Sequence, residues 1–192
     1  MKKITTVFID LDGVLVDWVN GMREYAGLPY STFDCFRQDP SKLCHEAMND
    51  LFGGKEILDK MMRERPPEFW YGLKKFPWAD ALINSMKAEF PISFLTKPGK
   101  NPHAASGKLK WKLDFYPDIP IIQTAEKYLC ASETKVLIDD DTYQLNKFAS
   151  AYGFILKWPN QFELEKLPMD YIQEVIINEF VDRIKDYEQT LE

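Results

Sequence analysis

A dense apolar segment near the N-terminus constrains the fold of this chain more than any other feature. Residues 4–11 hold Val7, Phe8 and Ile9 at their centre, with no polar residue between them. A strand with one solvated face would alternate apolar and polar residues, so this run indicates a strand that is covered on both faces. Strands of that kind belong to parallel sheets with helices on either side. The segment therefore predicts an α/β fold.

The rest of the chain repeats an alternation of strand-like and helix-like segments. Strands are expected at residues 92–95, 119–123, 135–138 and 154–158, and helices at residues 79–88, 104–113, 142–152 and 169–187. This alternation predicts an open, doubly wound parallel sheet. The last helix carries an apolar stripe but no side chains suited to catalysis. We expect it to cover either the core or a partner subunit, so a homodimer stays open.

A mostly helical stretch interrupts this alternation after the first strand. Trp18, Met22 and Tyr25 fall at helical spacing. Asp39 and Pro40 have the pattern of a helix start, an N-cap followed by proline at the first helical position. Further helices are expected at residues 43–51 and 57–62, with Gly53 and Gly54 between them and a break at Pro66 and Pro67. The predicted domains are a discontinuous core, residues 1–16 and 76–192, and a helical cap, residues 17–75.

The composition narrows the classes of protein to which the chain can belong. Its formal net charge of -6 argues against stable binding of nucleic acid, which needs clustered Lys and Arg. No apolar run approaches the roughly 20 residues of a membrane span, and Asp10 and Asp12 interrupt the first run before signal-peptide length. Three cysteines without C-x-x-C spacing indicate free thiols, and we expect a cytoplasmic protein. A zinc site at Cys35, Cys44 and His45 is the disfavoured alternative.

Three of the predicted strands end in polar residues. The first runs into Asp10 and Asp12, the second into Thr96, and a later one into Asp139 and Asp140. Asp or Thr alone at such a position is more often a turn or helix-cap residue. Two carboxylates two residues apart after a buried strand are harder to explain by packing. Because ligands of open α/β sheets bind at the carboxyl ends of the strands, these side chains are candidates for one site.

The chemistry of these residues favours a hard divalent cation. Crowded carboxylates repel one another, and a cation relieves the repulsion. Oxygen ligands without histidine favour Mg²⁺ over zinc or copper, and the whole chain has only two histidines. A carboxylate beside such a metal can attack phosphorus and form an acyl phosphate. The pattern therefore predicts magnesium-dependent phosphoryl chemistry.

The segment from Asp10 to Leu15 resembles the D-x-D-G-x-[VL] signature of the haloacid dehalogenase superfamily. Thr96, Lys127 and the pair Asp139-Asp140 resemble its second, third and fourth motifs in the same order. The resemblance implies a Rossmann-like α/β core with an inserted cap. It also implies a phosphatase that uses Mg²⁺ and a covalent aspartyl-phosphate.

Within this superfamily the chain is similar to the 5'(3')-deoxyribonucleotidases. The shared patterns are D-x-D-G-V-L-x-D-[FW], T-x-P, G-K-x-x-W and L-I-D-D, found at residues 10–18, 96–98, 107–111 and 137–140. The similarity implies a deoxynucleoside monophosphate as substrate. The chain departs from the pattern at Lys97, where the nucleotidases usually have a small hydroxyl residue, and at Asp141, where they usually have a basic one.

The resemblance assigns the chemical step and the metal site to aspartates. Asp10 is the nucleophile and a metal ligand. Asp12 is the general acid and then the general base, and its backbone carbonyl binds the metal. Asp139 completes the metal site, with Asp140 beside it.

The resemblance also implies contacts to the substrate. Thr96 hydrogen-bonds the transferring phosphoryl group, and Lys127 offsets the charge shared by nucleophile and phosphate. Lys108, and Lys97 beside Thr96, are expected to bind the phosphate, although a solvated basic helix face would explain Lys108 equally well. Trp18 is the expected stacking partner of the base. The remaining aromatic residues of the cap are expected to pack a small core: Phe33, Phe36, Phe69, Trp70 and Tyr71.

Other functions stay open beside the nucleotidase. One is a phosphatase of the same fold that acts on sugar phosphates or other small phosphomonoesters. Another is a catalytically silent binding protein, although competent residues at all motif positions count against it. A haloacid dehalogenase is disfavoured, because its chemistry needs neither Mg²⁺ nor an acid at position 12.

Overall fold

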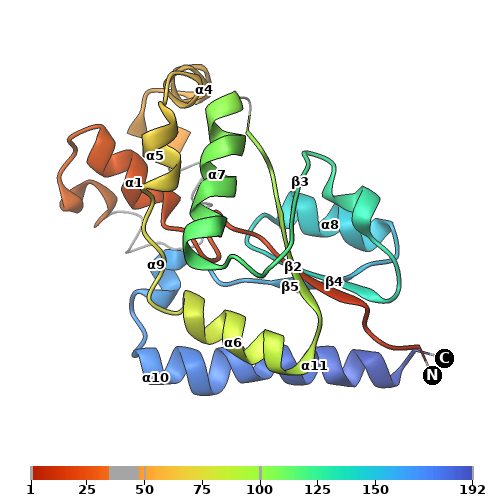
Figure 1. Cartoon of the computed structure of the whole chain (residues 1–192). Coiled ribbons are helices and arrows are strands. Elements are labelled where there is room, and N and C mark those ends of the chain that lie inside the picture. The colour runs from red at the N-terminus through yellow and green to blue at the C-terminus, as the bar shows by residue number, and fades with distance from the viewer. Residues whose placement is uncertain (1, 35–47, 50, 100, 192) are drawn as a thin grey trace.

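The computed structural model describes residues 2–34, 48–49, 51–99 and 101–191 (Figure 1). The predicted helix start at Asp39 and Pro40 lies outside these residues, as do the disfavoured zinc ligands Cys35, Cys44 and His45. None of the helices in the described ranges is both long enough and apolar enough to cross a membrane.

A parallel sheet forms the centre of the molecule. Within the described residues it has five strands: β1 (Thr6–Ile9), β2 (Ile92–Thr96), β3 (Ile121–Gln123), β4 (Lys135–Asp139) and β5 (Phe154–Lys157). Their order is β3-β2-β1-β4-β5, and every pair is parallel. Ile9 at the end of β1 pairs with Phe94 of β2 and Ile138 of β4. The exits of β2 and β4 therefore flank the exit of β1, and the predicted doubly wound α/β fold is confirmed.

Strand β1 is covered on both faces, as its apolar run predicts. Val7 and Ile9 belong to the larger core cluster, which also includes buried residues of α6 (Ala79–Glu89) and α11 (Asn178–Gln189). Phe8 points to the other face, where its ring meets Phe148 of α8 (Thr142–Ser150) edge-on, with ring centroids 6.3 Å apart. Successive residues of a strand face opposite sides. Because both faces of β1 are buried, neither set of alternate positions carries a polar residue.

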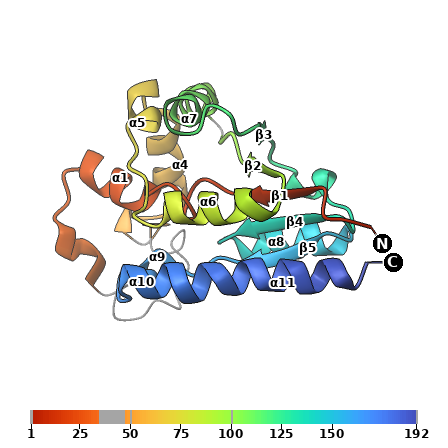
Figure 2. The ribbon, with the colours of Figure 1, turned by 60° about the horizontal axis from the view of Figure 1, so that its bottom comes forward.

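The C-terminal helical segment packs on the core of its own chain. It consists of α10 (Met169–Tyr171), a π-helical segment (Ile172–Ile177) and α11. Figure 2 shows α11 running alongside α6. Three residues of its apolar stripe, Phe180, Val181 and Ile184, are buried in the larger core cluster. Of the two roles expected for this stripe, covering the core is the one observed, and the homodimer stays a prediction.

The interrupting stretch contains α1 (Trp18–Tyr25), a 3-10 turn (Tyr30–Phe33), α4 (Lys55–Arg63) and α5 (Pro67–Tyr71). Its two ends lie side by side, because Asp17 N donates to Lys74 O at 2.9 Å and Phe76 N donates to Leu15 O at 2.9 Å. The predicted break at Pro66 and Pro67 is present, because α4 ends at Arg63 and Pro66 is extended. The helix α5 that begins at Pro67 was not predicted. Proline is favoured there because the first N–H of a helix needs no partner. That residues 17–75 form a domain of their own stays a prediction.

The remaining elements connect the strands. They are α7 (Pro102–Phe115), a 3-10 turn (Lys127–Cys130) and the short helix α9 (Gln161–Leu164). In Figure 1, α5 and α7 run side by side beyond the carboxyl ends of the strands. Helix α7 therefore links the interrupting stretch to the sheet.

Candidate active site

The exits of β1, β2 and β4 meet at one cavity of about 630 Å³. Asp10 directly follows β1, and its N–H continues the ladder to Ile138 O at 3.0 Å. Thr96 and Asp139 are the last residues of β2 and β4. The cavity is lined by all nine residues that the sequence suggested for a site: Asp10, Asp12, Trp18, Thr96, Lys97, Lys108, Lys127, Asp139 and Asp140.

Three carboxylates form a cluster at the floor of this cavity. Oxygen atoms of Asp10, Asp139 and Asp140 lie within 4.8 Å of one another. Gly13 leaves space for the cluster, because a Cβ at this position would lie 2.3 Å from Asp140 Oδ2. Its φ of +81° is also a conformation that other residues rarely adopt. The glycine of the first motif is therefore needed for both the turn and the approach of Asp140.

Lys127 is the cation of this cluster. Its Nζ lies 2.8 Å from Asp10 Oδ1 and 2.8 Å from Asp139 Oδ2, and the side chain is almost fully buried. Burial lowers the pKa of Lys127, but the charges of Asp10 and Asp139 outweigh that effect and hold the pKa above its ordinary value. The lysine therefore stays charged between the two carboxylates.

The carboxylates are nevertheless incompletely compensated. Burial, with the charge of Asp10, raises the pKa of Asp139 to about 6, although Lys127 opposes the shift. Burial and the charges of Asp139 and Asp10 raise the pKa of Asp140 well above its ordinary value. Among the described residues the cluster holds three carboxyl groups against one ammonium group, so it carries an excess of negative charge when all three are ionised. The oxygen-only donor set and this excess charge fit a hard divalent cation such as Mg²⁺.

Lys108 of α7 fixes the side chain of Asp12. Its Nζ donates to Asp12 Oδ2 at 2.6 Å, to Thr96 Oγ1 at 3.2 Å and to the carbonyl oxygen of Lys97 at 2.6 Å. An ammonium group has three donors, so all three are engaged. Lys108 is buried, which excludes the solvated helix face as its explanation. Contact of Lys108 with a phosphate, the role implied by resemblance, requires it to exchange one of these partners.

The two residues that depart from the nucleotidase pattern contact each other. Lys97 Nζ lies 3.0 Å from Asp141 Oδ2. Asp141 also caps α8, since its Oδ1 accepts from Tyr143 N at 2.9 Å, and its own N–H donates to Asp139 Oδ1 at 2.9 Å. Burial raises the pKa of Asp141, but the Lys97 ammonium and the backbone N–H groups of Tyr143 and Gln144 together outweigh burial and hold the pKa below its ordinary value. The two departures from the nucleotidase pattern, at Lys97 and at Asp141, are therefore the two partners of one ion pair.

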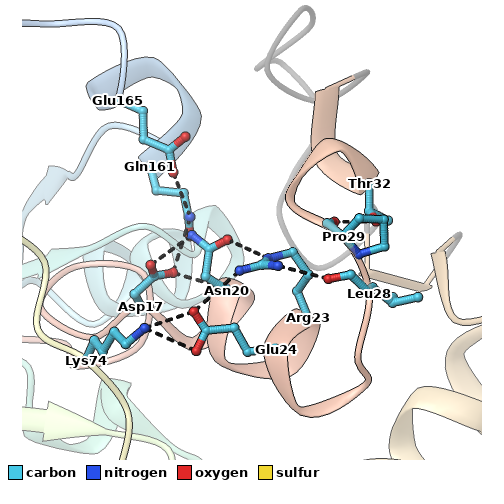
Figure 3. Close-up of polar contacts among 10 residues, drawn as sticks. All are labelled: Asp17, Asn20, Arg23, Glu24, Leu28, Pro29, Thr32, Lys74, Gln161 and Glu165. Carbon is cyan, nitrogen blue, oxygen red and sulfur yellow. Dashed lines mark hydrogen bonds and ion pairs between the residues drawn. The ribbon is translucent and has the colours of Figure 1, made fainter.

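The start of α1 places Trp18 at the cavity. Asp17 is the N-cap of this helix, and its Oδ1 accepts from Asn20 N at 3.1 Å. Gln161 Nε2 of α9 donates to the same oxygen at 3.4 Å (Figure 3). Burial raises the pKa of Asp17, and the hydrogen bonds from Asn20 only partly oppose this. The helix that carries Trp18 is therefore tied to an element of the core.

Sequence reasoning missed part of the cavity wall. Trp70 was assigned to packing, yet this buried residue of α5 also lines the cavity. Gln144 of α8 lines it too, one turn after the cap residue Asp141. A helix start at Pro67 was the signal that could have placed Trp70. Phe33 is buried, but its ring packs 5.7 Å from that of Phe162 of α9, outside the predicted cap, whereas Phe36 lies outside the described residues.

Comparison with known proteins identifies the fold. No protein-family model and no curated protein sequence matches the chain. Among solved structures, a haloacid dehalogenase-like hydrolase from Streptococcus pneumoniae matches with a TM-score of 0.51 and 17% identity over 88% of this chain and 93% of that chain. A dehalogenase matches with a TM-score of 0.52 and 14% identity, over 91% of this chain and 98% of that chain. A haloacid dehalogenase-like hydrolase from Xanthomonas campestris matches with a TM-score of 0.52 and 10% identity, over 95% of this chain and 94% of that chain. The chain thus has the fold of the haloacid dehalogenase-like hydrolases.

Proposed function

We propose that this chain is a magnesium-dependent phosphomonoester hydrolase that works through an aspartyl-phosphate on Asp10. The observation that carries the proposal is the cluster of Asp10, Asp139 and Asp140 at the carboxyl ends of β1 and β4, with the buried Lys127 paired to Asp10 and Asp139. Phosphoryl transfer depends on positioning and on compensating charge. A nucleophilic carboxylate held by a buried lysine meets both needs.

Each side chain has a place in the proposed reaction. Asp10 Oδ attacks phosphorus while the bond to the leaving oxygen breaks, and Asp12 gives that oxygen a proton. In the second step Asp12 takes a proton from a water molecule as that water attacks the phosphorus of the aspartyl-phosphate. The bond between phosphorus and Asp10 Oδ breaks, so inorganic phosphate is released and the Asp10 carboxylate is restored. Thr96, next to Lys108 Nζ, donates a hydrogen bond to the phosphoryl oxygens. Lys127 keeps the orientation of Asp10 through both steps.

The proposed cofactor is Mg²⁺, held by Asp10, Asp139 and Asp140 and by the backbone carbonyl of Asp12. When bound, it would supply charge neutralisation for the phosphoryl group and for the carboxylates. The buried excess of negative charge is the feature of this chain that supports a cation there.

The structure of Asp12 favours a phosphatase over a dehalogenase. Its Oδ2 is held by Lys108, while its Oδ1 is buried and has no hydrogen-bond partner among the described residues. A carboxylate with one anchored and one unpaired oxygen suits proton transfer to a substrate atom. Dehalogenation needs no such acid at this position.

We further propose a deoxynucleoside monophosphate as substrate. The cavity of about 630 Å³ has the size of a small-ligand site, and Trp18 and Trp70 are both in its wall. A stacked base gains about 1–3 kcal/mol from such a ring. Sugar phosphates are the alternative substrates, and a binding protein without turnover is the alternative of another class. The proposed partner is a small molecule, and the proposed location is the cytoplasm.

Phosphate release from two substrate panels tests this function. Nucleoside monophosphates and sugar phosphates are each incubated with the wild type in Mg²⁺ and in chelator, with Asp10→Asn as the matched control. We expect release only with Mg²⁺ and only from the wild type, and faster from deoxynucleotides than from sugar phosphates. Full activity in chelator contradicts the metal, and preference for sugar phosphates contradicts the nucleotidase. Binding of nucleotide without release identifies a silent binding protein.

A further inference from the structure

Gly107 of α7 packs directly against α5. A Cβ at this position would lie 2.3 Å from Trp70 Cβ and 3.2 Å from the carbonyl oxygen of Pro67. Ordinary van der Waals contact begins at 3.4 Å, so even a methyl group would require α5 to move by about 1 Å. Glycine inside a helix costs about 1 kcal/mol relative to alanine. The fit of α5 against this position is the physical reason for a glycine here.

Hydrogen bonds from two other residues of this segment attach the chain just before and just after α5 to α7. Trp111, one turn after Gly107, donates its indole N–H to Leu73 O at 2.9 Å in a buried hydrogen bond. At the start of α7, Asn101 Nδ2 donates to Arg65 O at 2.8 Å and to Met62 O at 3.1 Å. Helix α7 thus holds the chain before, along and after α5. The side-by-side course of α5 and α7 in Figure 1 reflects these three attachments.

The same helix also reaches the chemical centre. Lys108 directly follows Gly107, and its Nζ lies 2.6 Å from Asp12 Oδ2. Trp70, which contacts Gly107, lines the cavity that contains Asp12. Two consecutive residues of one helix therefore connect the indole in the cavity wall to the proposed acid. The separation of Trp70 and Asp12 depends on the absence of a side chain at position 107.

We infer that Gly107 is a specificity-determining positioning residue, which sets the separation of Trp70 from Asp12 for a leaving group with a planar ring. This inference rests on the proposed function. A leaving group that fills the space between the two residues depends on that separation. A small leaving group that stays beside Asp12 does not. The G-K-x-x-W segment then has two duties, because Lys108 faces the reacting groups while Gly107 and Trp111 place the wall opposite them.

Gly107→Ala tests the inference with two substrates, a deoxynucleoside monophosphate and acetyl phosphate, whose leaving group is small. We expect the KM for the nucleotide to rise about tenfold, within the range of a lost stacking contact, with little change in kcat. The kcat/KM for acetyl phosphate should stay within about twofold of the wild-type value, since its small leaving group stays beside Asp12 and does not contact Trp70. Ser106→Ala, an exposed neighbour on α7, is the matched control and should change neither substrate. Thermal unfolding of each variant verifies that it is folded.

A second variant covers the case in which Gly107→Ala unfolds. Trp111→Phe keeps a ring but removes the hydrogen bond to Leu73 O, so it loosens α5 without crowding it. It should raise the nucleotide KM selectively, by less than Gly107→Ala. Equal losses on both substrates, or no loss on either, contradict the inference. If the wild type hydrolyses neither substrate, the proposed function fails, and calorimetric binding of the nucleotide decides the inference: weaker binding by the variant supports it and an unchanged Kd overturns it.

Discussion

Lys97 Nζ lies 3.0 Å from Asp141 Oδ2, so the two residues that depart from the nucleotidase pattern form one ion pair at the cavity. The side chains are 43% and 40% exposed, and exposed pairs of this kind contribute about 0–1 kcal/mol. In the proposed reaction a substrate phosphate would replace Asp141 as the partner of Lys97 at little cost. The charges of the two departing residues compensate each other when no substrate is bound.

Asp141→Asn should lower the KM for phosphomonoesters by about two- to fivefold, because Lys97 then has no competing carboxylate. Asparagine keeps the cap of α8, so the fold should be preserved. The double variant Lys97→Met/Asp141→Asn is the control, and the gain should be absent there. A gain that persists without Lys97 would mean that Asp141 repels the substrate directly.

Asp140→Asn should stabilise the metal-free protein and abolish its stabilisation by Mg²⁺. The pKa of Asp140 is raised, so its contribution to stability is present below the ordinary pKa of 3.8 and is lost as the pH rises. At higher pH the buried site opposes ionisation of this carboxyl group and so opposes folding, and asparagine cannot ionise. Thermal unfolding in chelator and in Mg²⁺ measures both effects. A less stable variant in chelator would show that the carboxylate is compensated without metal.

Lys127→Met is the opposite change in the same cluster. It leaves Asp10 and Asp139 without their buried partner, and breaking a buried pair typically costs about 3–5 kcal/mol. The variant should be destabilised most strongly in chelator, since a bound cation would take over part of the compensation. Denaturation in urea with and without Mg²⁺ checks this, and a variant as stable as the wild type in chelator would contradict the role of Lys127.

Asp17 should make the stability of the wild type depend on pH in a defined direction. Its pKa is raised above 3.8 by burial, so its stabilising contribution is complete below that pH and is lost as the pH rises through the folded-state pKa. Asp17→Asn cannot titrate but keeps an N-cap oxygen for α1. The free energy of unfolding of the wild type minus that of the variant should therefore fall as the pH rises from about 4 to 7. A constant or rising difference would contradict the raised pKa.

The parallel sheet and the polar side chains at its edge could be predicted from the sequence, because both follow from local patterns. The run ending at Ile9 needs two covered faces, and polar residues directly after parallel strands must meet at one edge. Hence Asp10, Thr96 and Asp139 could be brought together without a structure.

The remainder of the site depends on contacts between segments that are distant in the sequence. Nothing near Lys97 indicates that Asp141 lies 3.0 Å away, because that distance depends on the spacing of β2 and β4 across β1. The three bonds of Lys108 likewise join residues from two strand exits. Trp70 packs in the core as predicted. Its additional place in the cavity wall depends on α5, which starts at Pro67 and has no periodic apolar pattern long enough to predict it.

Trp18→Ala should weaken nucleotides much more than acetyl phosphate. Loss of a stacked base costs about 1–3 kcal/mol, roughly 5- to 150-fold in affinity. Trp18→Phe retains a ring and should keep most of the nucleotide affinity. Steady-state kinetics on both substrates measure the difference, and equal losses would show that Trp18 only packs against neighbouring side chains.

The central claim is a phosphoryl group carried by Asp10, and trapping it in Asp12→Asn with p-nitrophenyl phosphate and Mg²⁺ tests this most directly. Nitrophenolate leaves without a proton, so the first step should survive, whereas the second lacks its base and should stall. Rapid mixing should show a burst of about one equivalent of nitrophenol, and mass spectrometry after acid quench should find one phosphoryl group on the peptide with Asp10. The variant Asp10→Asn/Asp12→Asn should show neither. Turnover without a burst and without an adduct, or an adduct on another residue, would contradict the account.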